Sequence, residues 1–173
     1  KKLKVISEGF DKLKEEKYIL KKGISIYTIN ELNEFYKSFK PDVIQIPLNV
    51  FDQRFVQSKW ANKLKKDKKE IHARSVFLQG LLLKNQNKIP KKFLKFSAEF
   101  KKWFVWLKKN NISNLNACLN FVYNQKIAAK VVVGLENYNQ LSQILKFKKD
   151  KKNLNFKKLA CNKKKLIDPR KWS

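Results

Sequence analysis

The stretch "EIHARSVFLQGLLL", residues 70–83, decides how the fold of this chain is interpreted. Its apolar and β-branched residues are typical of a buried strand, but it also carries His72, Arg74 and Ser75 and then reaches Gly80. Buried polar and charged groups are costly unless something binds them. The stretch therefore predicts a strand whose polar side chains lie at the edge of a site, unless the segment is not a strand at all.

Three other stretches share this strand-like character, namely residues 19–27, 42–50 and 128–135. The last two contain "VIQI" and "KVVVG", which are too apolar for half-exposed antiparallel strands. Helical patterns occupy the intervening segments, which are residues 28–39, 55–69, 93–109, 111–125 and, after the last strand, 137–147. The first helical segment opens with Thr28 and has Glu31 three residues later, which predicts a capping box.

Strands that alternate with helices indicate parallel βα units. A sheet of only four parallel strands has two open edges, whereas four βα units form half of an eight-fold barrel of about 250 residues. We therefore expect an α/β fold of the parallel (β/α)8 TIM-barrel type, of which these 173 residues carry roughly the second half. The chain contains no methionine, so its true start is expected upstream of Lys1. We expect residues 1–147 to form the half-barrel and residues 148–173 to form a basic C-terminal extension that packs on the barrel surface.

Polar residues and glycines gather where the expected strands end. Barrels of this type place their sites at the carboxyl ends of the strands. Three of the four glycines, Gly23, Gly80 and Gly134, fall at such ends, which predicts positions where the backbone itself requires glycine. The coincidence at four successive strand ends predicts one shared site.

The strong positive charge does not by itself indicate a nucleic-acid partner. The net charge is +27, but only Arg54, Arg74 and Arg170 are arginines, so 41 minus 3 leaves 38 lysines. Nucleic-acid surfaces favour arginine, and these lysines are spread from end to end. We interpret them as solvated surface charge. The alternative is a basic, non-catalytic module that binds nucleic acid or an anionic surface.

Membrane and metal sites find no support in the sequence. No apolar run approaches the roughly 20 residues of a membrane span, and no signal peptide is recognisable. Cys118 and Cys161 lack metal-ligand partners nearby, which predicts two small buried side chains in a reduced, cytoplasmic protein. We expect no metal, no membrane and no nucleic acid among the partners.

Four motifs carry a resemblance to a known family. They are, in order, "KKGISIYTINEL" (21–32), "DVIQIPLNVFDQRF" (42–55), "ARSVFLQGLLL" (73–83) and "VVVGLENYNQLSQIL" (131–145). As an ordered set they resemble the later strand ends of the aldo/keto reductase family, over about residues 8–147. The closing "IDPRKW" (167–172) resembles the C-terminus of some bacterial members.

The resemblance implies an oxidoreductase that reduces an aldehyde or ketone, such as a sugar, with NADPH or NADH and without a metal. Ser25 and Gln45 would hydrogen-bond the nicotinamide carboxamide, whose donors and acceptor suit a hydroxyl and an amide. Arg74 would replace an aromatic residue under the nicotinamide ring. The remaining cofactor-binding positions would be Ser75, Phe77, Gln79 and Gly80 along the pyrophosphate, and Gly134, Asn137 and Gln140 at the adenosine ribose and its 2′-phosphate.

The chain departs from the family pattern at several points. Ile26 stands where the family usually has asparagine, and Glu136 lies where many members carry Arg or Lys for the 2′-phosphate. The second change weakens the preference for NADPH, because a carboxylate can accept from a free 2′-hydroxyl. No segment matches the family's catalytic Asp, Tyr, Lys and His, which are expected upstream in the missing N-terminal half of the same protein. His72 is expected to be structural and one side chain out of phase with the ligand-facing residues.

Two consequences follow from the missing catalytic residues. The fragment alone is expected to be inactive. A third interpretation is a degenerate half-barrel without activity that packs against a partner chain.

Overall fold

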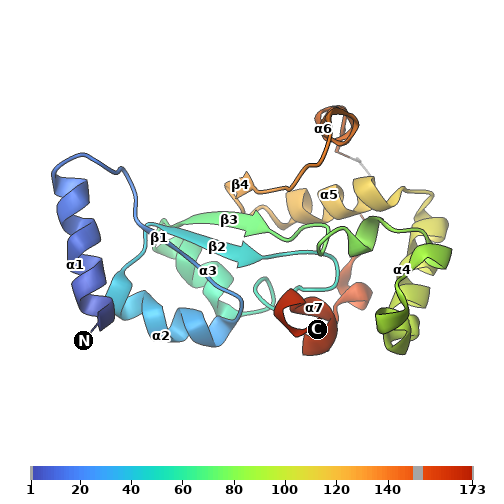
Figure 1. Cartoon of the computed structure of the whole chain (residues 1–173), viewed down its shortest axis with the longest axis horizontal. Helices are drawn as coiled ribbons and strands as arrows, with labels where there is room; N and C mark the ends of the chain where they lie inside the picture. The colour runs from blue at the N-terminus through green and yellow to red at the C-terminus, as the bar shows by residue number, and fades with distance from the viewer. Residues whose placement is uncertain (1, 150–153, 173) are drawn as a thin grey trace.

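A four-stranded parallel sheet organises the computed structural model, which describes residues 2–149 and 154–172 (Figure 1). The strands are β1 Gly23–Ser25, β2 Val43–Pro47, β3 Glu70–Arg74 and β4 Lys130–Val131, and they pair in chain order. The predicted parallel α/β fold is confirmed. All four strands are shorter than the apolar stretches that predicted them, and the outer strands β1 and β4 are the shortest.

The five predicted helical segments each contain a helix, while the helix before β1 and the short helix near the C-terminus were not predicted. Their bounds are α1 Lys2–Glu15, α2 Ile29–Phe39, α3 Lys59–Lys66, α4 Ser97–Asn110, α5 Asn114–Gln125, α6 Tyr138–Leu145 and α7 Lys164–Ile167. The capping box of α2 is confirmed, because Thr28 accepts from the backbone N–H of Glu31 and the Glu31 carboxylate accepts from that of Thr28. No helix in the described part of the chain is long and apolar enough to cross a membrane.

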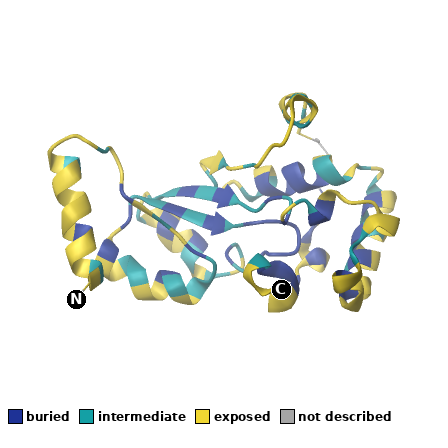
Figure 2. Cartoon of the chain, in the orientation of Figure 1, coloured by how far each residue is buried: buried dark blue, intermediate teal, exposed yellow. Residues whose placement is uncertain are grey.

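The two faces of the sheet differ sharply. Ile44, Ile46, Ile71 and Ala73 alternate along β2 and β3 and are buried in the core (Figure 2). The intervening side chains lie on the opposite face and are only partly covered. One face of the half-sheet is therefore packed on its helices, while the other carries polar residues.

The register of the sheet corrects the expected phase of His72. Ser25 pairs with Gln45, Gln45 with His72, and His72 with Lys130. Successive side chains of a strand alternate between faces, so paired residues share a face. His72 consequently lies in the same row as Ser25 and Gln45, and the expectation that it is out of phase was wrong.

The C-terminal segment enters the core. Leu159, Leu166 and Ile167 are buried, and the backbone N–H of Cys161 donates to the carbonyl of Phe51 at 2.8 Å. These contacts fix the end of the chain beside the loop that follows β2. The division of the chain at residue 147 stays a prediction.

Candidate functional site

The carboxyl ends of β1, β2 and β3 bring the predicted carboxamide-binding residues together. The hydroxyl of Ser25 donates to Oε1 of Gln45 at 3.2 Å. Nε of Arg74 donates to the same hydroxyl at 3.2 Å. Parallel strands end at one edge of a sheet, so three neighbouring strands deliver these side chains to a single place.

Arg74 continues this cluster towards the loop that follows β3. Its Nη1 donates to the Ser75 hydroxyl at 3.1 Å, and its Nη2 donates to the carbonyl of Ile26 at 3.0 Å. Its guanidinium carbon lies 4.1 Å from the centre of the Tyr27 ring. Arg74 thus ties the end of β3 to the end of β1, a role that the sequence did not predict.

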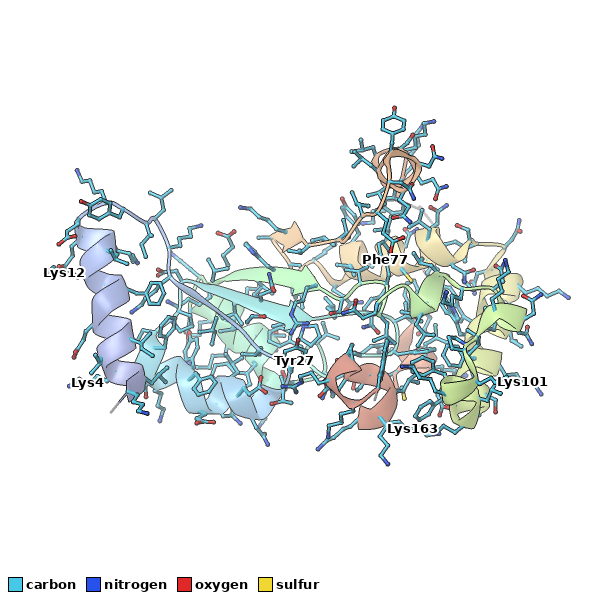
Figure 3. The ribbon with its side chains drawn as sticks, in the orientation of Figure 1. Lys4, Lys12, Tyr27, Phe77, Lys101 and Lys163 are labelled. Atoms are coloured by element: carbon cyan, nitrogen blue, oxygen red, sulfur yellow. The ribbon has the colours of Figure 1, made fainter. Side chains whose placement is uncertain are left out.

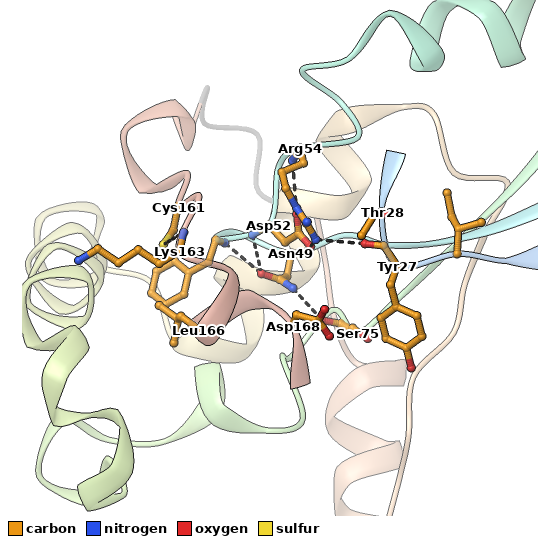
Figure 4. Close-up of polar contacts among 12 residues, drawn as sticks. Tyr27, Thr28, Asn49, Asp52, Arg54, Ser75, Cys161, Lys163, Leu166 and Asp168 are labelled. Atoms are coloured by element: carbon orange, nitrogen blue, oxygen red, sulfur yellow. Dashed lines mark hydrogen bonds and ion pairs between the residues drawn. The ribbon is translucent and has the colours of Figure 1, made fainter. Parts of the chain in front are cut away.

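Tyr27 is the centre of a second set of contacts at the end of β1 (Figures 3 and 4). Nη2 of Arg54 donates to the Tyr27 carbonyl at 3.2 Å, and the guanidinium carbon of Arg170 lies 3.8 Å from the ring centre. Arg54 also forms a bidentate pair with Asp52, and this structural link raises the pKa of Arg54. Sequence reasoning missed Tyr27, although the quoted motif "GISIY" contained it.

Asp42 does not belong to this link. Its carboxylate instead accepts from Nζ of Lys14 at 2.6 Å and from the backbone N–H of Lys22 at 3.0 Å. These bonds hold α1 to the start of β2. They also lower the pKa of Asp42, even though burial of the carboxyl acts in the opposite direction.

The loop after β3 holds an unusual backbone. Ser75, Leu78 and Gln79 have φ angles of 58°, 48° and 52°, and Gly80 has 75°. Left-handed conformations cost non-glycine residues about 1–3 kcal/mol each and persist where the surroundings enforce them. Part of that enforcement comes from the buried Asn49, whose side-chain N–H donates to the Ser75 carbonyl at 3.1 Å.

The other predicted cofactor residues lie apart from this cluster. Asn137 caps α6 by accepting from the backbone N–H of Gln140 at 3.0 Å, and a Cβ added at Gly134 would meet nothing within 4 Å. Phe77 is half-buried against the core, and Gln79 is exposed. Among the described residues, no hydrogen bond joins the group near α6 to Ser25, Gln45, Arg74 or Ser75.

His72 takes part in a charged cluster on the polar face. Its Nε2 lies 2.7 Å from Oε1 of Glu70, which also pairs with Lys21 and approaches Lys130 to 3.6 Å. The hydrogen bonds from Lys21 and then His72 lower the pKa of Glu70 to about 2. The contact of His72 with Glu70 fits the structural role expected for it. Within residues 2–149 and 154–172 no group of three or more potential metal ligands occurs.

Comparisons with known proteins identify the family and the fold. Residues 3–156 match the aldo/keto reductase family. The fold is similar to that of the holo form of aldo-keto reductase AKR11C1 from Bacillus halodurans, with a TM-score of 0.71 and 20% identity over 88% of this chain and 54% of that one. It is also similar to glycerol dehydrogenase AKR11B4 from Gluconobacter oxydans, with a TM-score of 0.56 and 17% identity over 83% and 53%.

The chain thus spans about half the length of these solved structures. A search of curated proteins finds no match to the sequence. The family match covers most of the chain and includes the strand ends on which the polar cluster lies. The chain belongs to the aldo/keto reductase family.

Proposed function

We propose that the chain is the C-terminal half of an NADPH- or NADH-dependent oxidoreductase that reduces an aldehyde or ketone. It supplies the nicotinamide side of the cofactor site. The observation that carries the proposal is the hydrogen-bonded set Ser25, Gln45 and Arg74 at adjoining strand ends. A sugar is one substrate of this class, and the buried unpaired Cys118 and Cys161 suit a reducing, cytoplasmic setting.

The donor set at Ser25 and Gln45 fits a nicotinamide carboxamide. The Ser25 hydroxyl donates to Gln45 and accepts from Arg74, which leaves one lone pair on its oxygen. The side-chain NH2 of Gln45 donates to no protein group in the described residues. A carboxamide N–H can therefore donate to Ser25, and its carbonyl can accept from Gln45.

The bound nicotinamide would supply the hydride. Ser25 and Gln45 would orient it, and residues of the missing half would supply the proton. The remaining positions proposed for the cofactor are Arg74, Ser75, Phe77, Gln79, Gly80, Gly134, Asn137 and Gln140. Neither Arg nor Lys occurs between Gly134 and Gln140, which leaves NADH as acceptable as NADPH.

Exposed apolar residues at both ends of the sheet support the half-barrel proposal. On α1, Val5 and Ile6 are 66% and 51% exposed, and on α6 Leu145 is 74% exposed. Apolar surface of this kind marks places where another element packs. The proposed occupant is the N-terminal half of the same protein, which would pair with the free edges of β1 and β4. Residues 1–147 would then be the half-barrel, and residues 148–173 its basic extension.

The test uses the full-length protein. We expect it to bind and oxidise NADPH or NADH in the presence of an aldehyde, and Gln45→Ala to weaken cofactor binding about fivefold through one lost hydrogen bond. The matched control is Gln143→Ala on the exposed surface of α6, which should bind the cofactor like the wild type.

Two results contradict the proposal. One is a folded full-length protein that binds neither nicotinamide nucleotide. The other is equal cofactor affinity in Gln45→Ala and Gln143→Ala. Nucleic-acid binding with a steep salt dependence and no cofactor binding would favour the basic module instead.

A further inference from the structure

Arginine is rare in this chain, with three arginines against 38 lysines, and all three arginines contact the same residue. Arg54, Arg74 and Arg170 all contact Tyr27, one through its carbonyl and two through its ring. Figure 3 shows Lys4, Lys12 and Lys101 on outer helices, away from Tyr27. The planar cations are therefore concentrated at the carboxyl end of β1.

Two of these arginines are neutralised by bidentate carboxylates. Arg54 donates to both oxygens of Asp52, at 2.8 and 2.7 Å. Arg170 donates to both oxygens of Asp168, at 3.0 and 2.8 Å. In each pair, two N–H groups of the guanidinium donate to the two oxygens of one carboxylate, so the carboxylate neutralises the arginine.

Arg74 is different, because its partners are all neutral. Its hydrogen bonds go to the hydroxyls of Ser25 and Ser75 and the carbonyl of Ile26, so three of its five N–H groups are used, and its face stacks on the Tyr27 ring. Within the described residues no carboxylate lies within 4.0 Å of its guanidinium.

The carboxylates in its neighbourhood are engaged elsewhere. Glu31 accepts from the backbone N–H of Tyr27 and lies 3.6 Å from Arg170. Glu70, four residues earlier on the same face of β3, is shared among Lys21, His72 and Lys130. Neither is positioned to pair with Arg74.

We propose that Arg74 binds an oxyanion group, a carboxylate or a phosphate, of a ligand seated at the carboxyl ends of β1, β2 and β3. A partly covered guanidinium without a counter-ion is costly, and a charge-assisted hydrogen bond to an oxyanion offsets that cost. Ser25, Ser75 and Ile26 hold the guanidinium in place, so its two remaining N–H groups are oriented before the ligand arrives.

Under the proposed function, such an oxyanion has two sources. Only the choice between these two sources rests on the proposed function. One source is the pyrophosphate of the cofactor. The other is a carboxylate carried by the carbonyl substrate. Stacking of a nicotinamide would use the face of the guanidinium, whereas an oxyanion uses its edge, so the two roles do not compete.

The experiment compares wild-type full-length protein with Arg74→Gln, Arg74→Lys and the control Lys101→Gln, which removes one exposed charge on α4. The first arm measures, by calorimetry and without substrate, the affinity for inorganic pyrophosphate. The second arm measures kcat/KM for a small keto acid relative to its uncharged methyl ester. We expect Arg74→Gln to lower one of these quantities about tenfold and Lys101→Gln to lower neither.

The arm that changes identifies the source of the oxyanion. Arg74→Lys keeps the charge but loses the planar fork, so it should lie between the wild type and Arg74→Gln. If the glutamine variant does not fold, wild-type values in Arg74→Lys overturn the proposal. Unchanged values in a folded Arg74→Gln overturn it as well. Pyrophosphate binding that depends on Arg74, in a protein that binds no nicotinamide nucleotide, would refute the proposed function and support this inference.

Discussion

Gly23 begins β1 directly beside Val43 of β2, and a single methyl group there tests the geometry of the site. A Cβ at this position would lie 2.8 Å from the carbonyl oxygen and 3.0 Å from the Cβ of Val43. Ordinary van der Waals contact begins at 3.4 Å, so the strands must separate by 3.4 minus 2.8, or 0.6 Å. Overpacking of this kind costs about 1–3 kcal/mol. The smaller entropy of the unfolded alanine chain offsets roughly 0.4–1 kcal/mol of that.

We therefore expect Gly23→Ala to lower the free energy of unfolding of the full-length protein by about 1–2 kcal/mol. Urea denaturation followed by tryptophan fluorescence measures it. The matched control is Gly9→Ala within α1, where nothing lies within 4 Å of the new methyl group. That variant should gain about 0.5–1 kcal/mol, because alanine favours the helix over glycine. A gain of stability in Gly23→Ala comparable to that in Gly9→Ala would refute the close approach of the two strands.

The same substitution has a consequence for the cofactor. Ser25 lies two residues beyond Gly23 and on the same face, and its hydroxyl reaches Gln45 over 3.2 Å. A separation of the strands near Gly23 lengthens this bond. Gly23→Ala should thus weaken nicotinamide binding several-fold, measured by cofactor fluorescence, while Gly9→Ala leaves it unchanged.

Three further predictions concern other local features of the fold. Gly80→Ala places an alanine at a φ of 75° and should cost about 1 kcal/mol in urea denaturation, whereas Gly134→Ala, which has no positive φ, should cost nothing measurable. Thr28→Ala removes the N-cap of α2 and should cost about 1 kcal/mol, seen as a lower denaturation midpoint. The pKa of Glu70 is lowered to about 2 from 4.5, so its ionised form stabilises the fold above pH 4.5 and this contribution is lost as the pH falls towards 2. Glu70→Gln should flatten the dependence of stability on pH in that window; an unchanged pH profile would show that the ionised Glu70 carboxylate and its contacts with Lys21 and His72 do not stabilise the fold.

Features set by neighbouring residues could be predicted from the sequence, while features set by distant pairing could not. The capping box of α2 was predicted because Thr28 and Glu31 lie within one turn. His72 lies two residues before Arg74, so strand alternation alone puts both on one face, and the expectation that it was out of phase misapplied this local rule. Its pairing with Gln45 depends on the register of β2 and could not be predicted. Gly23 begins β1, so its predicted place at a carboxyl end was wrong, although its closeness to Val43 does require glycine. Gly80 has a positive φ, whereas Gly134 has neither a positive φ nor a close neighbour.

In the candidate site, too, some contacts could be predicted from the sequence and others could not. Ser25 and Gln45 could be predicted because both lie in strands of a recognisable parallel pattern, and the structure places them in contact. The stacking of Arg170 on Tyr27 could not be predicted, because it brings the end of the chain to the end of β1. Nothing in the spacing of either motif encodes that contact.

The contrast between lysine and arginine bears on how the charge of the chain is distributed. A lysine on a solvated helix needs only water, and its position is weakly constrained. A bidentate pair such as Arg54 with Asp52 requires a planar fork, which lysine does not have. Stacking on a ring, as Arg74 does on Tyr27, requires a planar cation too. In this lysine-rich chain, the positions of the few arginines therefore say more about the site than the sum of all its charges does.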